Sequence, residues 1–587
     1  MGRAERLITE HLDLWSSAIK AKPSAGRGAN KKLELYGISK LRELILDLAV
    51  RGMLVEQNPE DAPASSLLKQ AAIEKDQLVK DKRIKKQKPL RQITKEREPY
   101  QLPVGWEWEQ MGNLSTQITD GTHHTPEYIN SGVPFISVKD IDGRRISFRD
   151  CKYISQEQHV EINARCNPQL GDILICRIGT LGRATIVDTE RAFSLFVSVG
   201  LIKFPQHLYT PRFAHLALHS PLLIKQYEKI KAGGSHTNKL NLRDLPKLLL
   251  PVAPLAEQHR IVAKVDELMA LCDQLEEEQE NNLDTHETLV STFLNALTSA
   301  AADASQFADS WQRIQDNFDI LFTTASSVDQ LKQTILQLAV MGKLVPQDPE
   351  DEPSQVLLGR IATERARLIK EKKIKNSKCS LTNDALSKIR IPTIWQLTTL
   401  GNVADWGSGS TPKRENQNHY GGSLTWLKSG ELNDCQALRG SSEKITEEAV
   451  KAGSFRRNII GDILIAMYGA TIGKVAILDE TAYTNQAVCG CTPFDGVFNR
   501  YLFFYLISQR KNFHAASEGG AQPNISKVKL LGYPLPLPPL AEQHRIVAKV
   551  DELFTLCDHL KARLYEVQKT QLTLADSIVE RAIHPPD

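Results

Sequence analysis

Four short polar stretches of the 587-residue chain carry side chains that suit contacts to anions or to hydrogen-bonding edges. They span residues 120–126, 234–239, 407–414 and 520–527, and each contains glycine beside Thr, His, Asn, Lys or Arg. Glycine lets a loop backbone come close to a ligand, and such side chains bind phosphates and nucleic-acid base edges. Turns without a ligand are the alternative interpretation. The candidate contact residues are Thr122, His123, His124, Ser235, His236, Asn238, Lys239, Ser410, Thr411, Lys413, Arg414, Gln522, Asn524 and Lys527.

Catalytic and metal-binding patterns are missing from the sequence. No GxxxxGK[ST] phosphate loop occurs, and the nearest stretch, residues 407–413, lacks its spacing. No zinc-ligand set and no pair of carboxylates with catalytic spacing stands out. Cys489 and Cys491 would make only half of a metal site, so we interpret them as thiols of a strand core. We therefore expect no catalytic residue, no metal and no cofactor in this chain.

The polar stretches need a frame to position them, and the clearest part of that frame occurs twice. Residues 254–268 and 539–553 both read PLAEQHRIVAKVDEL. Apolar residues in each copy are spaced by four and three positions, which is typical of a coiled-coil seam. We therefore expect two long helices that pack on each other. The predicted seam consists of Ile261, Val265, Leu268, Cys272 and Leu275 in the first copy and Ile546, Val550, Leu553, Cys557 and Leu560 in the second, where it continues through Leu564, Val567, Leu574 and Ile578.

A second repeat lies upstream of each long helix. Residues 39–63 match residues 329–353, and Leu41, Ile45 and Leu48 lie on one face of the first predicted helix. The match runs on into two basic runs, residues 80–88 and 370–378. We interpret these runs as solvated helix ends, and contact with phosphates is the alternative.

Two stretches of mixed character, residues 102–252 and 391–537, lie between the repeats. Both contain the sequence GDILI, at 171–175 and 461–465, but they differ at most other positions. Short β-branched runs such as residues 133–138 predict strands, and apolar helical periods occur in both stretches. The sequence therefore predicts two α/β modules with the same topology and different surfaces.

Composition restricts the setting of the protein. Lys and Arg number 73 and Asp and Glu 70, so the net charge of +3 neither favours nor excludes a polyanionic partner. No apolar stretch reaches the roughly 18 residues of a membrane span, and the N-terminus lacks a signal-peptide core. Nine cysteines without framework spacing indicate free thiols. We expect a cytoplasmic protein without a membrane partner.

The repeated PL-x-EQ-x-x-I-V-x-K-V-D-E-L helix after each of two dissimilar α/β modules resembles the specificity subunit of type I restriction-modification systems, in the subset with a long N-terminal region. The resemblance covers nearly the whole chain. It implies an α/β fold with two target recognition domains separated by long antiparallel coiled-coil helices, as a pseudo-two-fold tandem repeat. It also implies that each domain reads one half of a split, asymmetric DNA site and that the helices set the spacer length.

Partners and cofactors follow from the same resemblance. The implied partners are double-stranded DNA, two methyltransferase (modification) subunits and restriction (translocase and endonuclease) subunits. S-adenosylmethionine, ATP and Mg would be used by those subunits to methylate adenine or to cleave DNA, whereas this chain is expected to be non-catalytic. The Asn/Asp-Pro-Pro-Tyr/Phe tetrapeptide, with which adenine methyltransferases hold a flipped base, does not occur in it.

The repeats and the resemblance together predict the domain boundaries. Two other classes of protein remain as alternatives: a self-sufficient DNA-modifying enzyme with an unrecognised site, and a coiled-coil scaffold that binds only protein. The expected domains are an N-terminal helical region at 1–101, a first target recognition domain at 102–253, a central helical spacer at 254–388, a second target recognition domain at 389–538 and a C-terminal coiled-coil helix at 539–587.

Overall fold

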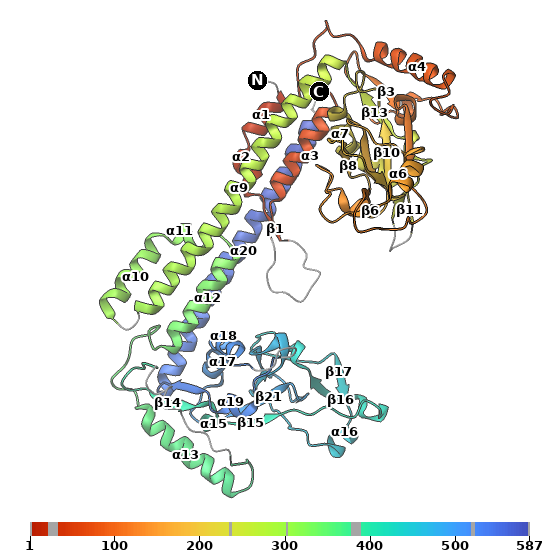
Figure 1. Ribbon diagram of the computed structural model, residues 1–587. Coiled ribbons are helices and arrows are strands. Elements are labelled where there is room, and N and C mark those ends of the chain that lie inside the picture. Colours follow the sequence, from red (N-terminus) through yellow and green to blue (C-terminus); the bar gives the residue numbers. More distant parts are fainter. Residues whose placement is uncertain are drawn as a thin grey trace. The chain divides into compact units, whose positions relative to one another are not determined.

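The computed structural model describes residues 3–21, 33–233, 238–300, 303–376, 389–517 and 523–584, and these form two compact units (Figure 1). Unit 1 contains the described residues up to Asn281 and those from Gln568 onward, and unit 2 contains the described residues of Asn282–Val567. The two predicted long helices are α9 (Leu255–Ser299) and α20 (Leu540–Ile583). Unit 1 holds the start of α9 and the end of α20, so α9 passes from unit 1 into unit 2 and α20 passes from unit 2 into unit 1.

Helices of unit 1 form the first half of the frame. They are α1 (Arg3–Thr9), α2 (Leu12–Ser17), α3 (Tyr36–Val50) and α4 (Ala64–Lys80), with the shared parts of α9 and α20. Helix α3 lies alongside α9 (Figure 1), and its predicted face is buried in the same apolar core as the first part of the α9 seam and the last turns of α20. Gly52, in the left-handed conformation (φ 67°), follows the end of α3.

Module 1 contains four described sheets, and three of them join strands that are distant in sequence. Its four-stranded antiparallel sheet has the order β4 (Gln117–Asp120), β10 (Val199–Lys203), β7 (Ile173–Cys176) and β8 (Ala184–Ile186). A second sheet has the order β6 (Lys152–Ile154), β5 (Val133–Ile136) and β9 (Ser194–Leu195), and a third pairs β13 (Leu249–Val252) with β3 (Glu107–Gln110).

Short helices and connecting pairs complete unit 1. Both α7 and α8 begin with a capping hydroxyl and proline, Thr210-Pro211 and Ser220-Pro221, which suit the first turn of a helix. The remaining elements are β1 (Lys20–Ala21), β2 (Leu33–Glu34), α5 (Met111–Leu114), α6 (Gln156–Asn163), α7 (Pro211–His219), α8 (Pro221–Ile230), β11 (Lys231–Ala232) and β12 (Lys239–Leu240).

Module 2 repeats the same strand orders with different residues. Its four-stranded sheet is β15 (Ala404–Ser408), β21 (Val488–Pro493), β18 (Ile463–Ala466) and β19 (Val475–Ile477). The smaller sheets are β17 (Glu443–Ile445), β16 (Tyr420–Leu427) and β20 (Tyr483–Thr484), and the pair β14 (Gln396–Thr399) and β22 (Pro534–Leu537). The GDILI sequences lead into β7 and β18, as predicted.

Helices of unit 2 provide the second half of the frame. Helix α12 lies alongside α20 (Figure 1), and one apolar core joins both to the end of α9 and to the module. The helices of this unit are α10 (Ala304–Asp316), α11 (Phe318–Leu321), α12 (Ala325–Val340), α13 (Ser354–Lys370), α15 (Leu400–Val403), α16 (Glu447–Ala452), α17 (Asn499–Ser508), α18 (Arg510–Ala515) and α19 (Lys527–Leu531).

The seam prediction is confirmed in part. Ile261, Val265, Leu268 and Cys272 are buried, as are Ile546, Val550 and Cys557, whereas Leu275, Leu553, Leu560, Leu564 and Ile578 are partly buried. The predicted continuation is wrong at Val567 and Leu574, whose side chains are 56% and 49% exposed. These residues lie close to the boundary between the two units, where the helix leaves one core and enters the other.

The predicted fold class is confirmed. Both modules mix helices with sheets, the strand orders of three sheets correspond between the modules, and each module is followed by a helix of more than forty residues. The chain is therefore an α/β tandem repeat built on long helices.

Candidate nucleic-acid interface

In module 1, a buried carboxylate holds the first polar stretch at one end of the four-stranded sheet. Asp120, the last residue of β4, is buried and pairs with Arg177 and Arg165. His123 is exposed, and its Nε2 lies 3.2 Å from Asp120 Oδ2. Gly121 is required here because a Cβ would collide with the Leu195 carbonyl oxygen. The start of the stretch, Asp120 and Gly121, is thus fixed by these contacts, and the part that follows is exposed.

The exposed part of this stretch is a turn with its own hydrogen bonds. Thr122 Oγ1 accepts a hydrogen bond from the His124 N–H at 3.2 Å, and the side chain of His124 is exposed. Thr122 also pairs through its backbone with Phe196. Thr122 therefore takes part in a turn, while His123 and His124 present imidazoles to solvent. Contact of these residues with a ligand stays a prediction.

Arg177 connects the first polar stretch to the second. It follows β7, its Nε donates to the Leu240 carbonyl at 3.1 Å, and the Leu240 N–H donates to the Arg177 carbonyl at 2.8 Å. The next residue, Ile178, pairs with Lys239. Asn238 and Lys239 are exposed and lie at the same end of the sheet as the first stretch. Ser235 and His236 lie outside the described residues.

Module 2 brings its two polar stretches together in the same way. Lys527 Nζ donates to the carbonyl of Trp406 in β15 at 2.5 Å. Asn524 pairs through its backbone with Tyr468, which follows β18. Beyond β15, the Ser410 N–H donates to the Thr484 carbonyl at 2.8 Å, which fixes the start of the first stretch. Gln522 lies outside the described residues.

The side chains of the first stretch in module 2 differ in how far they are engaged. Arg414 pairs with Glu443 at 2.6 Å and lies over the Tyr420 ring, 4.9 Å from its centroid. Hydrogen bonds from Arg414 and then from Lys428 lower the pKa of the Glu443 carboxyl. Thr411 donates to the side chain of Gln486. A phosphate would have to compete with Glu443 for Arg414.

Lys413 is exposed beside these residues. Within the described part of the chain it forms no ion pair. A solvated lysine at the edge of a sheet is available for a phosphate without the loss of an existing contact.

The two basic runs lie at the ends of helices α4 and α13, which belong to the second sequence repeat. Lys82 after α4 and Lys372 after α13 both adopt positive φ, 58° and 55°, so each helix ends in the same turn. Lys85, Lys86 and Lys88 are exposed. Residues 377 and 378 lie outside the described residues. Solvated ends and phosphate contacts both require this exposure, so the interpretation as solvated ends and its alternative, contact with phosphates, both stay open.

Sequence reasoning missed the role of the polar residues inside the duplicated stretch. In unit 1, the buried Glu257 accepts hydrogen bonds from the indole Nε1 of Trp106 at 2.9 Å and from Gln57 Nε2 at 2.6 Å. The next residue, Gln258, accepts from the Thr210 N–H at 2.9 Å with its side-chain oxygen and donates to two carbonyls. Glu257 and Gln258 thereby join the start of α9 to the module and to the loop after α3.

Unit 2 contains the same contacts. Glu542 accepts from Trp395 Nε1 at 2.8 Å and from Gln347 Nε2 at 2.6 Å, and Gln543 accepts from the Phe498 N–H at 2.8 Å. We name each glutamate, with its tryptophan and glutamine donors, a glutamate latch. The signal in the sequence was that Glu and Gln occur unchanged in both copies of the duplicated stretch, ahead of the first seam residues Ile261 and Ile546.

The latch glutamates are carboxylates in an apolar setting. Burial raises the pKa of Glu257 and of Glu542, and the tryptophan and glutamine hydrogen bonds oppose that rise. An ion pair supports each latch one turn further on, Arg260 with Asp61 and Arg545 with Asp351, both at 2.6 Å. A buried carboxylate with two donors is stable only while both donors are in place.

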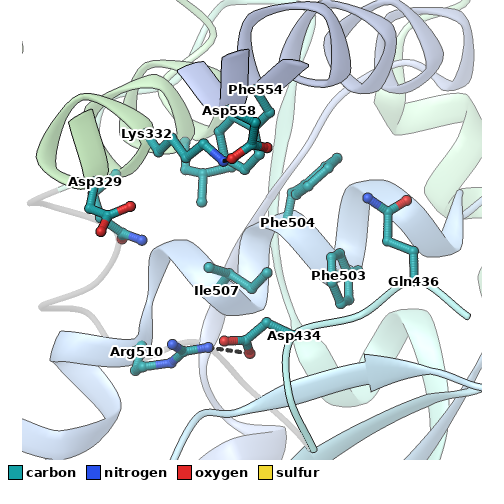
Figure 2. A pocket seen from close by; sticks show the side chains of 12 residues that line it. Asp329, Lys332, Asp434, Gln436, Phe503, Phe504, Ile507, Arg510, Phe554 and Asp558 are labelled. Atoms are coloured by element: carbon teal, nitrogen blue, oxygen red, sulfur yellow. Dashed lines mark hydrogen bonds and ion pairs between the residues drawn. The ribbon is translucent and has the colours of Figure 1, made fainter. Parts of the chain in front are cut away.

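A cavity of about 400 Å³ lies in unit 2 between α12, α17 and α20 (Figure 2). Aromatic side chains line part of it, and charged residues surround them. Lys332 pairs with Asp558 and Arg510 with Asp434, both at 2.5 Å. Because these charges are already paired, the cavity offers none of them to a ligand.

The described residues contain neither a metal-binding cluster nor a membrane-spanning helix. No group of three or more His, Cys, Asp or Glu side chains is arranged to hold a metal ion. No helix of the described ranges combines the length and the apolar character that crossing a membrane requires. The eight described cysteines form no disulfide with one another, and burial raises the pKa of the Cys489 thiol to about 11.

Comparisons with known proteins identify relatives of both modules and of the whole chain. Residues 103–285 and 392–569 match the family described as type I restriction modification DNA specificity domain. The chain is 35% identical to the type I restriction enzyme EcoEI specificity subunit of Escherichia coli and 34% identical to the EcoAI specificity subunit of the same organism. Each comparison covers 99% of this chain and 100% of the relative. A crystal structure of the HsdS subunit from Thermoanaerobacter tengcongensis has 19% identity and a TM-score of 0.42, covering 83% of this chain and 99% of that one.

Two matched domains, each of which extends into a long helix, define a tandem DNA-specificity protein. The chain belongs to the family of type I restriction-modification specificity subunits.

Proposed function

We propose that this chain directs a type I restriction-modification complex to its DNA site and catalyses nothing by itself. Each module would read one half of a split, asymmetric site. Partner subunits would then methylate adenine or cleave DNA. In this proposal S-adenosylmethionine, ATP and Mg are used by the partners, and the complex works in the cytoplasm.

The correspondence between the two sheet ends supports this proposal most directly. Both modules gather two polar stretches at one end of a sheet with the same strand order. The side chains there differ, with imidazoles in module 1 and Lys413 and Arg414 in module 2. The same scaffold with different exposed donors is what two readers of different base sequences require.

We assign the DNA contacts to the polar stretches. The residues are Thr122, His123, His124, Ser235, His236, Asn238 and Lys239 for one half-site, and Ser410, Thr411, Lys413, Arg414, Gln522, Asn524 and Lys527 for the other. The boundaries of the two reading domains are 102–253 and 389–538. Helices α9 and α20 would set the spacer length and bind two methyltransferase subunits, to which the restriction subunits would be added.

The test uses the chain purified alone and in complex with its methyltransferase partner. The complex is expected to protect a split DNA site and to methylate it with S-adenosylmethionine, while the chain alone transfers no methyl group. Methylation by the chain alone would identify a self-sufficient enzyme. A complex that binds all DNA sequences equally, or none, would identify a protein-only scaffold.

Single substitutions then separate the two readers. His124→Ala is expected to weaken recognition of one half-site, and Lys413→Ala recognition of the other, because the two residues lie in different modules. An effect of either variant on both half-sites would contradict independent reading.

A further inference from the structure

A third loop lies beside the two polar stretches of each module. It follows β7 in module 1, at residues 178–182, and β18 in module 2, at residues 468–473. In module 2 the Gly469 N–H donates to the Pro523 carbonyl at 2.8 Å, and the Ile525 N–H donates to the Met467 carbonyl at 3.0 Å. Tyr468 itself pairs with Asn524. The loop therefore borders the polar stretch that contains Asn524 and Lys527.

The base of the loop in module 2 is rigid. Arg510 Nε donates to the Gly473 carbonyl at 3.0 Å, and Arg510 also pairs with Asp434 (Figure 2). Asp434 Oδ1 in turn accepts from the Val475 N–H at 3.1 Å. A Cβ at Gly473 would lie 3.0 Å from the Arg510 side chain, so the chain passes close to this anchor.

The tip of the loop, in contrast, is open. Gly469 adopts the left-handed conformation (φ 61°), and no atom of the described residues, apart from its chain neighbours, lies within 4 Å of the place where a Cβ would stand. Gly179 in module 1 has the same two properties, with φ 80°. Both glycines are required by backbone conformation, and neither fills a packed position. A rigid loop with an open glycine tip presents its backbone for close approach to a ligand.

Tyr468 makes this tip chemically distinctive. Tyr468 is 41% exposed, and among the described residues its hydroxyl forms no hydrogen bond and its ring contacts no other ring. Its backbone carbonyl accepts a hydrogen bond from Thr471 Oγ1 at 2.8 Å. The ring can stack on a base or contact a thymine methyl group, and the hydroxyl can donate to an acceptor on a base edge. The corresponding residue of module 1, which pairs with Lys239 as Tyr468 pairs with Asn524, is Ile178. The two modules thus share the loop and differ at the side chain beside its tip.

We propose that this loop is a third DNA-contact segment in each module and that Tyr468 selects bases in the half-site read by module 2. The inference rests on the proposed function, because it assumes that the polar end of the sheet faces DNA. It adds a specificity-determining residue that lies outside the four polar stretches.

The test compares Tyr468→Ala, Tyr468→Phe and Ile460→Ala in the full complex with the methyltransferase partner. Ile460 is the matched control because its side chain is 65% exposed and it precedes the opposite end of the same strand. The probes are a duplex with the recognised site and duplexes with each base pair of the two half-sites changed in turn. Binding is measured at one fixed salt concentration, because affinity depends on salt.

Tyr468→Ala is expected to lower affinity for the recognised duplex by about 5- to 150-fold, the range for a lost base contact. It should also reduce the loss of affinity, here called the penalty, that at least one changed base pair causes in the half-site of module 2. The penalties in the other half-site should stay unchanged. Tyr468→Phe keeps the ring, so it separates the loss of the hydroxyl from the loss of the stack. Ile460→Ala should bind the recognised duplex and every changed duplex with the affinity of the parent.

Two results would overturn the inference. One is Tyr468→Ala with parental affinity and parental penalties. The other is a loss of affinity that is equal for every duplex, because that pattern belongs to a backbone contact or to a damaged module. A parent complex without any sequence preference would instead refute the proposed function, so the two failures are distinguishable.

Discussion

The glutamate latch of unit 2 makes a quantitative prediction for Trp395→Phe. The substitution removes the indole N–H that donates to Glu542 at 2.8 Å and keeps most of the ring. Glu542 then retains only the Gln347 hydrogen bond in a buried position. A hydrogen bond to a buried charged group contributes about 1.5–3 kcal/mol. The folded-to-unfolded ratio of unit 2 should therefore fall about 10- to 150-fold at neutral pH.

The same substitution predicts a pH dependence with a definite sign. Burial already raises the pKa of Glu542, and the Trp395 hydrogen bond opposes that rise, so its loss raises the folded-state pKa further. A group with a raised folded-state pKa stabilises the fold below its unfolded pKa, and this contribution is lost as the pH rises through the folded-state value. The loss of unfolding free energy caused by Trp395→Phe should thus be largest at neutral pH and should become smaller on acidification.

Chemical denaturation at several pH values, followed by probes in unit 2, measures this deficit. Trp406→Phe is the matched control, because the Trp406 indole is buried in the same unit and donates to a neutral acceptor, the Leu400 carbonyl, at 2.8 Å. Its deficit is expected to be about 0.5–1.5 kcal/mol and independent of pH in this range. Trp106→Phe should repeat the Trp395 result in unit 1. Trp395→Phe with parental stability, or with a deficit that does not change with pH, would refute the reasoning.

Three further predictions concern the frame, the sheet end and the complex. Leu268→Asp should destabilise unit 1 by about 3 kcal/mol or more in thermal or denaturant unfolding, because Leu268 is only 3% exposed. The same change at the exposed Val567 should cost under about 0.5 kcal/mol. Arg177→Ala should lower the free energy of unfolding by about 3–5 kcal/mol, because it leaves the buried Asp120 with only the exposed Arg165 as an arginine partner. Equal stability of variant and parent would contradict the role of Arg177 as the partner of Asp120. Affinity of the complex for DNA should fall steeply as salt rises, because phosphate contacts release counterions, and a flat response in a binding titration would argue against DNA as the ligand.

The sequence by itself determined the features that depend on local patterns. The identical stretches predicted two long helices, and four-and-three spacing predicted the buried positions Ile261, Val265 and Leu268. The GDILI sequences marked corresponding strands in the two modules. These predictions hold because helical and strand periodicity is set by residues that are close in sequence.

Only the tertiary structure decided which residues meet across the chain. Glu257 and its donor Trp106 are 151 positions apart, and Asp120 and Arg177 are 57 apart, so no periodicity links them. The seam prediction likewise failed at Val567 and Leu574, which are exposed close to the residue where α20 passes from one unit to the other. The sequence did not predict the loop with Tyr468, because its place beside Asn524 results from backbone pairing between distant segments. Burial and pairing of this kind depend on the packing of whole elements, which local sequence does not specify.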